Sequence, residues 1–179
     1  MRKAIFICLL ISLGVISYLN RSKQSDLYDS VIHKAAQRHQ VPFSLIKAVI
    51  RKESSFIAKQ KGAAGEYGLM QIMPIAADEW ARLNNRKKLS YYASLYDPEI
   101  NIDIGTYLLS VNLKRWQRYD DRLVLALAEY NAGLGNLRKE KWNPKKYNEK
   151  VLERITFPTT KKYVSDILLY RTEYLEYDK

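Results

Sequence analysis

Apolar residues recur every three or four positions from Ser25 onward, the spacing that puts side chains on one face of an α-helix. The first such helix follows Ser25 or Asp26, either of which can cap it. Its apolar side comprises Leu27, Val31, Ile32 and Ala35. A second helix is expected over Val41–Lys52, because Pro42 suits a first helical turn, where its missing N–H is not needed. Its buried face comprises Ile46, Val49 and Ile50.

Further helices are expected later in the chain, after residues 54–67, which are polar and contain glycine and are interpreted as a loop beside a groove. Four such helices are expected: one over Pro74–Leu83, a long one that begins at Asp97-Pro98, one over Leu123–Tyr130 and one over Pro158–Tyr177. In the long helix Asp97 is the cap and Pro98 takes the first turn. Its apolar face comprises Ile100, Ile104, Leu108 and Val111. Because no strand-like alternation exceeds a few residues, the sequence predicts a mainly α fold.

The N-terminal segment differs from the rest of the chain. Met1–Lys3 is basic, and Ala4–Leu19 carries no charge. A helix of that length spans about 24 Å, short of the roughly 30 Å hydrocarbon core, so a signal peptide and a short anchor are both possible. Ser17–Asn20 lacks the small-x-small pattern of a cleavage site. We therefore favour an uncleaved membrane anchor over residues 4–19, with residues 1–25 as anchor and linker and residues 26–179 as one exported, periplasmic or extracytoplasmic domain.

The formal charge of the chain is +11, of which +7 belongs to the residues from Asp26 onward. A basic balance favours polyanionic partners such as nucleic acid or the carboxylate-bearing peptidoglycan. Because no nucleic-acid-binding module is recognisable and the domain is expected outside the membrane, peptidoglycan is the expected partner and nucleic acid is not. The single cysteine, Cys8, leaves the exported domain without disulfides. His33 and His39 are interpreted as helix-surface residues, and no metal is expected.

Glu53 is the first candidate for chemistry. It follows the apolar positions of the Val41–Lys52 helix by three, four and seven residues, so it projects from the same face. It also lies at the helix end, where the macrodipole disfavours a negative charge. Partial desolvation there should raise the pKa of Glu53 and keep it protonated near neutral pH, as a general acid requires. The alternative is that Glu53 turns to solvent or pairs with Arg51 or Lys52.

Three ordered motifs surround this residue and match a known family. They are Glu53-Ser54-Ser55-Phe56, Gly68-Leu69-Met70-Gln71-Ile72-Met73-Pro74 and Tyr130-Asn131-Ala132-Gly133. Together with Tyr163-Val164, they make the chain resemble the SLT-type lytic transglycosylase family from about Asp26 to about Tyr170. The resemblance implies a lysozyme-like, mainly α single domain after the N-terminal hydrophobic segment.

The resemblance also implies an activity. Enzymes of this family cleave the β-1,4 bond between N-acetylmuramic acid and N-acetylglucosamine in peptidoglycan, and one Glu serves as acid and then as base. The muramic acid 6-hydroxyl attacks C1, which leaves a 1,6-anhydro end. Glu53 matches the position of this Glu. A usual glycosidase needs a second carboxylate, but an internal hydroxyl is already held at high effective concentration. No cofactor is implied.

The same resemblance assigns residues that bind substrate. Gln71 matches the glutamine expected to hydrogen-bond the sugar near the scissile bond, and Met70 matches the neighbouring groove residue. Tyr130 matches a tyrosine whose hydroxyl approaches the catalytic Glu, and Asn131 matches an asparagine that binds substrate. Tyr163 matches the tyrosine of the C-terminal motif and ranks below Tyr130. A role in packing, or at the surface, is the alternative for each of them.

Three positions depart from the family pattern. Gly62 lies nine residues after Glu53, where the family often has a serine that contacts substrate. Glu129 stands where alanine usually precedes Tyr-Asn, and Thr159 stands where the C-terminal motif commonly has Glu. None of these changes removes the acid, but each affects an expected substrate contact.

Other functions stay open. If Glu66 or Glu129 faced the groove opposite Glu53, it could position water, and the protein would be a hydrolytic muramidase similar to goose-type lysozymes. Helical geometry turns Glu129 about 100° away from Tyr130, which leaves Glu66; exposure or salt bridges are the simpler roles for both. A non-catalytic, membrane-tethered peptidoglycan-binding module would keep the groove without needing the acid. Binding to duplex DNA is a third possibility, which salt-dependent binding would test.

Overall fold

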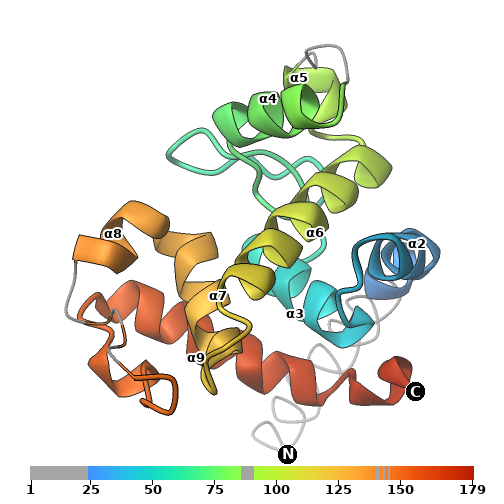
Figure 1. The fold of residues 1–179 in the computed structure, drawn as a ribbon. Helices are drawn as coiled ribbons and strands as arrows, with labels where there is room; N and C mark the ends of the chain where they lie inside the picture. The colour runs from blue at the N-terminus through green and yellow to red at the C-terminus, as the bar shows by residue number, and fades with distance from the viewer. Residues whose placement is uncertain (1–23, 86–90, 140–141, 143, 145) are drawn as a thin grey trace, which may run out of the picture.

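The computed structural model describes residues 24–85, 91–139, 142, 144 and 146–179 (Figure 1). The α-helices in this part of the chain are α2 (Asp29–His39), α3 (Phe43–Ser54), α4 (Pro74–Leu83), α5 (Tyr91–Ser94), α6 (Pro98–Arg115), α7 (Arg122–Ala132), α8 (Leu134–Lys139) and α9 (Pro158–Thr172). Two 3₁₀ turns cover Leu152–Arg154 and Leu175–Asp178. Among the described residues the only β-pairing is a pair of isolated bridges on Tyr67. The prediction of a mainly α fold is confirmed.

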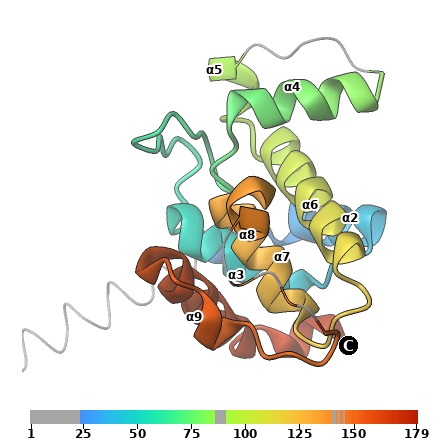
Figure 2. The same cartoon turned by 60° about the vertical axis from the view of Figure 1, so that its left-hand side comes forward.

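The long helix α6 runs through the middle of the molecule, with α4 and α5 beyond its first residues and α9 on the opposite side (Figures 1 and 2). It packs against α2 and α7. As a result it is buried on more than one side: Ile102, Ile104 and Leu109 have no exposed surface. The predicted single apolar face was therefore too narrow, because a helix covered from several directions buries residues off that face as well.

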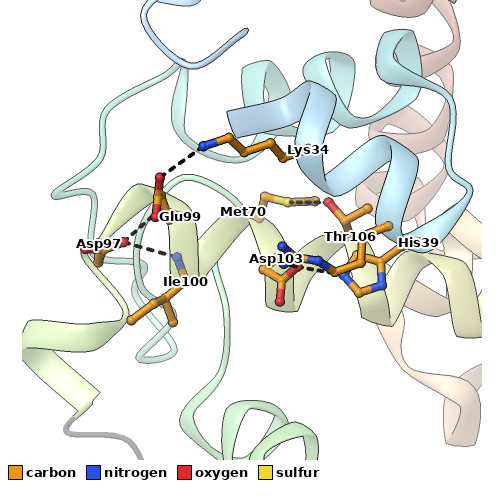
Figure 3. A network of polar contacts seen from close by, with 9 residues as sticks. Lys34, His39, Met70, Asp97, Glu99, Ile100, Asp103 and Thr106 are labelled. Atoms are coloured by element: carbon orange, nitrogen blue, oxygen red, sulfur yellow. Dashed lines mark hydrogen bonds and ion pairs between the residues drawn. The ribbon is translucent and has the colours of Figure 1, made fainter. Parts of the chain in front are cut away.

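Polar contacts fix the start of α6 and join it to α2 (Figure 3). The Asp97 carboxylate accepts the backbone N–H groups of Glu99 and Ile100 at 2.8 and 3.1 Å, as the predicted cap requires. The ring of His39 lies 2.8 Å from Asp103. The expectation of a surface histidine holds for exposed His33 but is wrong for His39, which is largely buried between α2 and α6 where a carboxylate satisfies it.

The beginning of the domain differs from the predicted cap. Helix α2 starts at Asp29, and Leu27 is 71% exposed instead of lying on the apolar side. The Asp26 carboxylate accepts hydrogen bonds from the hydroxyl of Ser25 and from the ammonium group of Lys47. Residues 24–26 are themselves helical, and a turn separates them from α2, whose N-cap position is Tyr28; neither Ser25 nor Asp26 caps this helix.

The remaining helices match the apolar pattern where it is strong. Pro74 and Leu83 bound α4 as predicted, and Gly133 ends α7 with a φ of 80°. The last predicted helix stops at Thr172, and a 3₁₀ turn follows it. The short helices α5 and α8 were not predicted, because four to six residues carry too little periodicity to be recognised.

The predicted anchor over residues 4–19 lies outside the described residues. In the part of the chain that the structure describes, every helix is too short or too polar to cross a membrane.

Candidate active site

The loop between α3 and α4 is fastened to both α3 and α6. The hydroxyl of buried Ser54 donates to the Leu69 carbonyl at 2.8 Å. From α6, the side chain of Asn101 accepts the N–H of Met70 at 2.7 Å and donates to the carbonyls of Tyr67 and Leu95 at 2.8 and 2.7 Å. Asn101 has no exposed surface, so these bonds form away from water. The second half of the loop is therefore held rigidly beside the end of α3.

Gly68 is required where this loop passes α6. Its φ is +78°, a value that residues with a side chain rarely adopt. A Cβ atom there would lie 2.3 Å from both the Leu95 carbonyl oxygen and the amide nitrogen of Asn101. The glycine thus allows the loop backbone to pass close to Leu95 and Asn101, and the residue after it, Leu69, is bonded to Ser54 next to Glu53.

Met70 and Gln71 point to different environments. Met70 has no exposed surface, and its sulfur accepts a weak hydrogen bond from Thr106 of α6 at 3.9 Å. The structure therefore places the Met70 side chain in the core and not in the groove expected for a substrate contact, because α6 covers it. Gln71 is partly exposed, with a strained φ of 49°. Its amide nitrogen donates to the carbonyls of Gly68 and Gln60 at 2.7 and 3.3 Å, which fixes the direction of the amide oxygen.

Glu53 lies in the last turn of α3 and meets a tyrosine from the far end of the sequence. The hydroxyl of Tyr163, on α9, donates to Oε1 of Glu53 at 2.6 Å. Beside it, Lys52 reaches α9 as well and pairs with Asp166 at 2.7 Å. Tyr163 is only 4% exposed, so the contact is shielded from solvent. The packing of α3 against α9 therefore positions the carboxyl group of Glu53.

The surroundings of Glu53 favour its protonated form. Burial raises the pKa of Glu53 from 4.5 to about 7, even though the Tyr163 hydrogen bond lowers it. The negative charge of Glu66 raises this pKa further, while Lys52 lowers it. Burial also raises the pKa of Tyr163 well above its ordinary value, so its hydroxyl keeps the proton that it donates. A carboxyl group with a pKa near 7 can both give and take a proton at neutral pH.

Tyr130 and Asn131 lie in the last turn of α7, and Tyr130 reaches the loop that carries Met70. The Tyr130 hydroxyl donates to the backbone carbonyl of Met70 at 3.0 Å. It is close enough to Glu53 for the carboxylate to contribute to the raised pKa of Tyr130, although burial is the larger cause. The direct hydrogen bond to Glu53 thus comes from Tyr163, the lower-ranked tyrosine of the sequence analysis. Asn131 is exposed and accepts a hydrogen bond from Thr160 of α9 at 2.8 Å.

Two positions that depart from the family pattern, Glu129 and Thr159, and the loop carboxylate Glu66 have distinct surroundings. Both oxygens of Glu129 are engaged, one by the indole N–H of Trp116 at 2.7 Å and one by Arg115 at 3.1 Å. This ion pair agrees with a structural role for Glu129. Glu66 is partly exposed in the loop, and Thr159 is exposed in the first turn of α9.

Two cavities lie at opposite ends of α7. One, of about 210 Å³, is beside the residues just described and is lined by Gln71, Ile72, Met73, Ala76, Leu108, Asn112, Glu129, Tyr130 and Leu134. The other, of about 460 Å³, includes Arg122 at the start of α7 and Pro42 at the start of α3. Although it is larger, it lies a full helix length from Glu53, so we place the candidate site at the smaller one.

Sequence reasoning did not identify several residues that shape this site. Asn101, Ser54 and Thr160 each fix the backbone or side chain of a predicted site residue. Asn101 occupies a buried position of α6 among apolar residues, which is the one signal that the sequence offered.

The chain is similar to known proteins over most of its length. The sequence model of the transglycosylase SLT domain matches residues 30–152. The chain is 33% identical over 150 residues to the soluble lytic murein transglycosylase of Escherichia coli strain K12, covering 82% of this chain and 23% of the relative. It is 35% identical over 102 residues to the membrane-bound lytic murein transglycosylase E of Buchnera aphidicola, covering 56% and 46%.

A solved structure shows the same fold. The 70-kDa soluble lytic transglycosylase of Escherichia coli superimposes with a TM-score of 0.74 at 31% identity, over 85% of this chain and 25% of that one. This likeness confirms the expected lysozyme-like domain. The chain spans about a quarter of the length of these Escherichia coli proteins. The motifs, the fold and the family match lead to one conclusion: the chain belongs to the transglycosylase SLT domain family.

Proposed function

We propose that this protein is a peptidoglycan lytic transglycosylase that cleaves the β-1,4 bond between N-acetylmuramic acid and N-acetylglucosamine. The observation that carries the proposal is the partly buried Glu53, whose carboxyl group has a pKa of about 7 and accepts a hydrogen bond from Tyr163 at 2.6 Å. The names of the relatives, which are lytic murein transglycosylases, support the same substrate.

The reaction follows from a single group that changes its protonation state. Protonated Glu53 gives its proton to the glycosidic oxygen as the bond from that oxygen to C1 breaks. The muramic acid 6-hydroxyl oxygen then forms a bond to C1, and its proton passes to the Glu53 carboxylate. The product is a 1,6-anhydro end, and no water is consumed. The Tyr163 hydroxyl holds the carboxyl group in place and stabilises its charged form between the two steps.

Neighbouring side chains are proposed to bind the sugar. Gln71 lines the 210 Å³ cavity, and because its amide nitrogen is already committed to backbone carbonyls, its amide oxygen is the atom left to accept a hydrogen bond. Tyr130 lines the same cavity, and Asn131 is exposed next to it in sequence. Met70 contributes through its backbone, which supports Tyr130.

Analysis of the products tests this proposal. Purified peptidoglycan is digested with the protein and, in parallel, with its Glu53→Gln variant, and the released muropeptides are examined by mass spectrometry. We expect 1,6-anhydro-muramic acid ends from the protein and none from the variant. Unchanged release by the variant would show that Glu53 is not the acid. Binding without release by either protein would support a non-catalytic wall-binding module.

A hydrolytic muramidase is the second candidate, and one observation favours it. Glu66 lies close enough to Glu53 for its charge to raise the pKa of that residue. A second carboxylate near the acid is what hydrolysis requires, because it can position water. Reducing ends in place of anhydro ends would assign the protein to this class.

We further infer that the protein acts outside the cytoplasmic membrane, tethered by residues 4–19. The uncharged Ala4–Leu19 run behind a basic start supports this location, and so does a relative named as membrane-bound. Mass spectrometry of the protein isolated from cells tests the tether: an intact N-terminus is expected, and a mature N-terminus near Arg21 would rule the tether out.

A further inference from the structure

Two hydrogen-bond acceptors converge on the space above Gly62. A Cβ atom on this glycine would lie 2.1 Å from a carboxylate oxygen of Glu66 and 2.7 Å from the amide oxygen of Gln71. The φ of Gly62 is not among the positive values, so the backbone does not require glycine here. What the glycine provides is room for the Glu66 carboxylate, which lies where a Cβ atom would be, with the Gln71 amide oxygen beside it.

The local structure holds both oxygens in this direction. The Gly62 N–H donates to the Glu66 carbonyl at 2.8 Å, which closes the tip of the loop. The Glu66 carboxylate then accepts the N–H of Ala64 at 3.0 Å. On the other side, the amide nitrogen of Gln71 donates to Gly68 and Gln60, so its oxygen points the other way, toward Gly62. Both oxygens are hydrogen-bond acceptors, so a group that binds to both must be a hydrogen-bond donor.

This space belongs to the same site as Glu53. The charge of Glu66 acts on the Glu53 carboxyl group, and Gln71 lines the cavity beside Tyr130. A carboxylate and an amide oxygen together repel an anion and accept hydrogen bonds from a donor group. Sugar hydroxyl and acetamido N–H groups are donors of this kind, and they occur along every glycan strand.

We propose that Glu66 is a substrate-binding residue: its carboxylate, seated over Gly62, and the amide oxygen of Gln71 accept hydrogen bonds from a hydroxyl or acetamido N–H group of the glycan. The inference rests on the proposed function in that it takes a peptidoglycan glycan as the ligand. It gives the loop carboxylate a role in binding the sugar, separate from any role in activating water.

Binding measurements in the Glu53→Gln background test this proposal, because that variant separates binding from turnover. The ligand is a preparation of soluble, peptide-free glycan strands, and its dissociation constant is measured by calorimetry. Adding Glu66→Ala should weaken binding about 10- to 100-fold, the range for losing a hydrogen bond to a charged group. The matched control is Glu79→Gln, an exposed carboxylate of α4, which should leave binding unchanged.

Gly62→Ala provides an independent variant. Its methyl group must displace the flexible end of Glu66, so it should weaken binding as much as Glu66→Ala does. In the Glu66→Ala background the methyl group still lies 2.7 Å from the Gln71 amide oxygen, so the double variant should bind more weakly than either single variant. Circular dichroism confirms that each variant is folded. A Glu66→Ala affinity within about 2-fold of the parent protein, or a Gly62→Ala affinity equal to that of the parent protein, would overturn the proposal.

The pH dependence of turnover distinguishes Glu66 from a merely structural residue. The groups that act on Glu53 are Glu66 from the loop, Lys52 from α3 and Tyr163 from α9, and Tyr130 of α7 is close to it. Loss of the Glu66 charge should shift the alkaline fall in activity to lower pH, while Glu79→Gln should not. An unchanged profile would contradict the placement of Glu66. If the parent protein shows no turnover, the proposed function fails, but the binding result still decides the role of Glu66.

Discussion

At the scale of single residues, the environment of Glu53 makes folding stability depend on pH. The pKa of Glu53 is about 7 in the folded protein against 4.5 as its ordinary value. Between these values the unfolded chain has lost a proton that the folded protein retains, so this contribution to stability is fully present below the lower pKa and falls as pH rises to the upper one. The loss is on the order of 3 kcal/mol.

Glu53→Gln should therefore stabilise the protein at alkaline pH, because the amide has the same shape and does not ionise. We expect the variant to be more stable than the parent by up to about 3 kcal/mol near pH 8 and by little near pH 4. Urea unfolding at both pH values measures the difference. Equal stabilities near pH 8 would mean that the folded protein solvates the carboxylate as well as water does.

The sequence could predict the acid but not its hydrogen-bond partner. Helical spacing alone placed Glu53 at a helix end on the apolar face, and the structure has it in the last turn of α3, partly buried beside Tyr163. Tyr163 is 110 residues away, and whether it or Tyr130 bonds Glu53 depends on how α9 crosses α3. The burial of Met70 likewise depends on α6, which covers it. Contacts of this kind are set by tertiary packing, which no local pattern encodes.

At the scale of elements, Asn101 connects α6 to the loop that carries Gln71. Replacing it by alanine leaves the Met70 N–H and the Leu95 carbonyl without this partner in a buried place. It also removes one of two hydrogen bonds to the Tyr67 carbonyl, which keeps the one from the Ile72 N–H. We expect Asn101→Ala to lower the free energy of unfolding by about 3 kcal/mol. It should also weaken glycan binding, because Gln71 follows directly after Met70. Urea unfolding and calorimetry measure the two effects.

Asn136→Ala is the matched control, since this asparagine of α8 bonds a carbonyl of Ala132 at the exposed surface. Its effect on stability should be small. If both variants lost the same stability, the loop would not depend on α6. Helix boundaries themselves were predictable where a proline or a capping residue marks them, as at Pro74 and Asp97. They were not predictable at Asp29, because a separate helical turn over residues 24–26 precedes α2.

At the scale of the whole molecule, one buried lysine joins the beginning of the domain to its end. Lys47 of α3 is 1% exposed, and its ammonium group lies 2.6 Å from Asp29 and 3.2 Å from Asp26. The rings of Tyr174 and Tyr177 lie 5.4 and 5.1 Å from the same group, in cation–π contact. Both ends of the described domain thus meet on the helix that carries Glu53.

Lys47→Met should loosen both ends while keeping the apolar part of the side chain. Asp29 and Asp26 keep some access to water, so we expect a loss of about 1–3 kcal/mol, less than for a fully buried pair. Hydrogen exchange should rise around Asp26 and around Tyr174 together, because a single contact connects them. Lys34→Met, which removes an exposed partner of Glu99, should change neither region. If exchange rose at one end only, the two ends would be held independently, and the position of α3 would not depend on their connection.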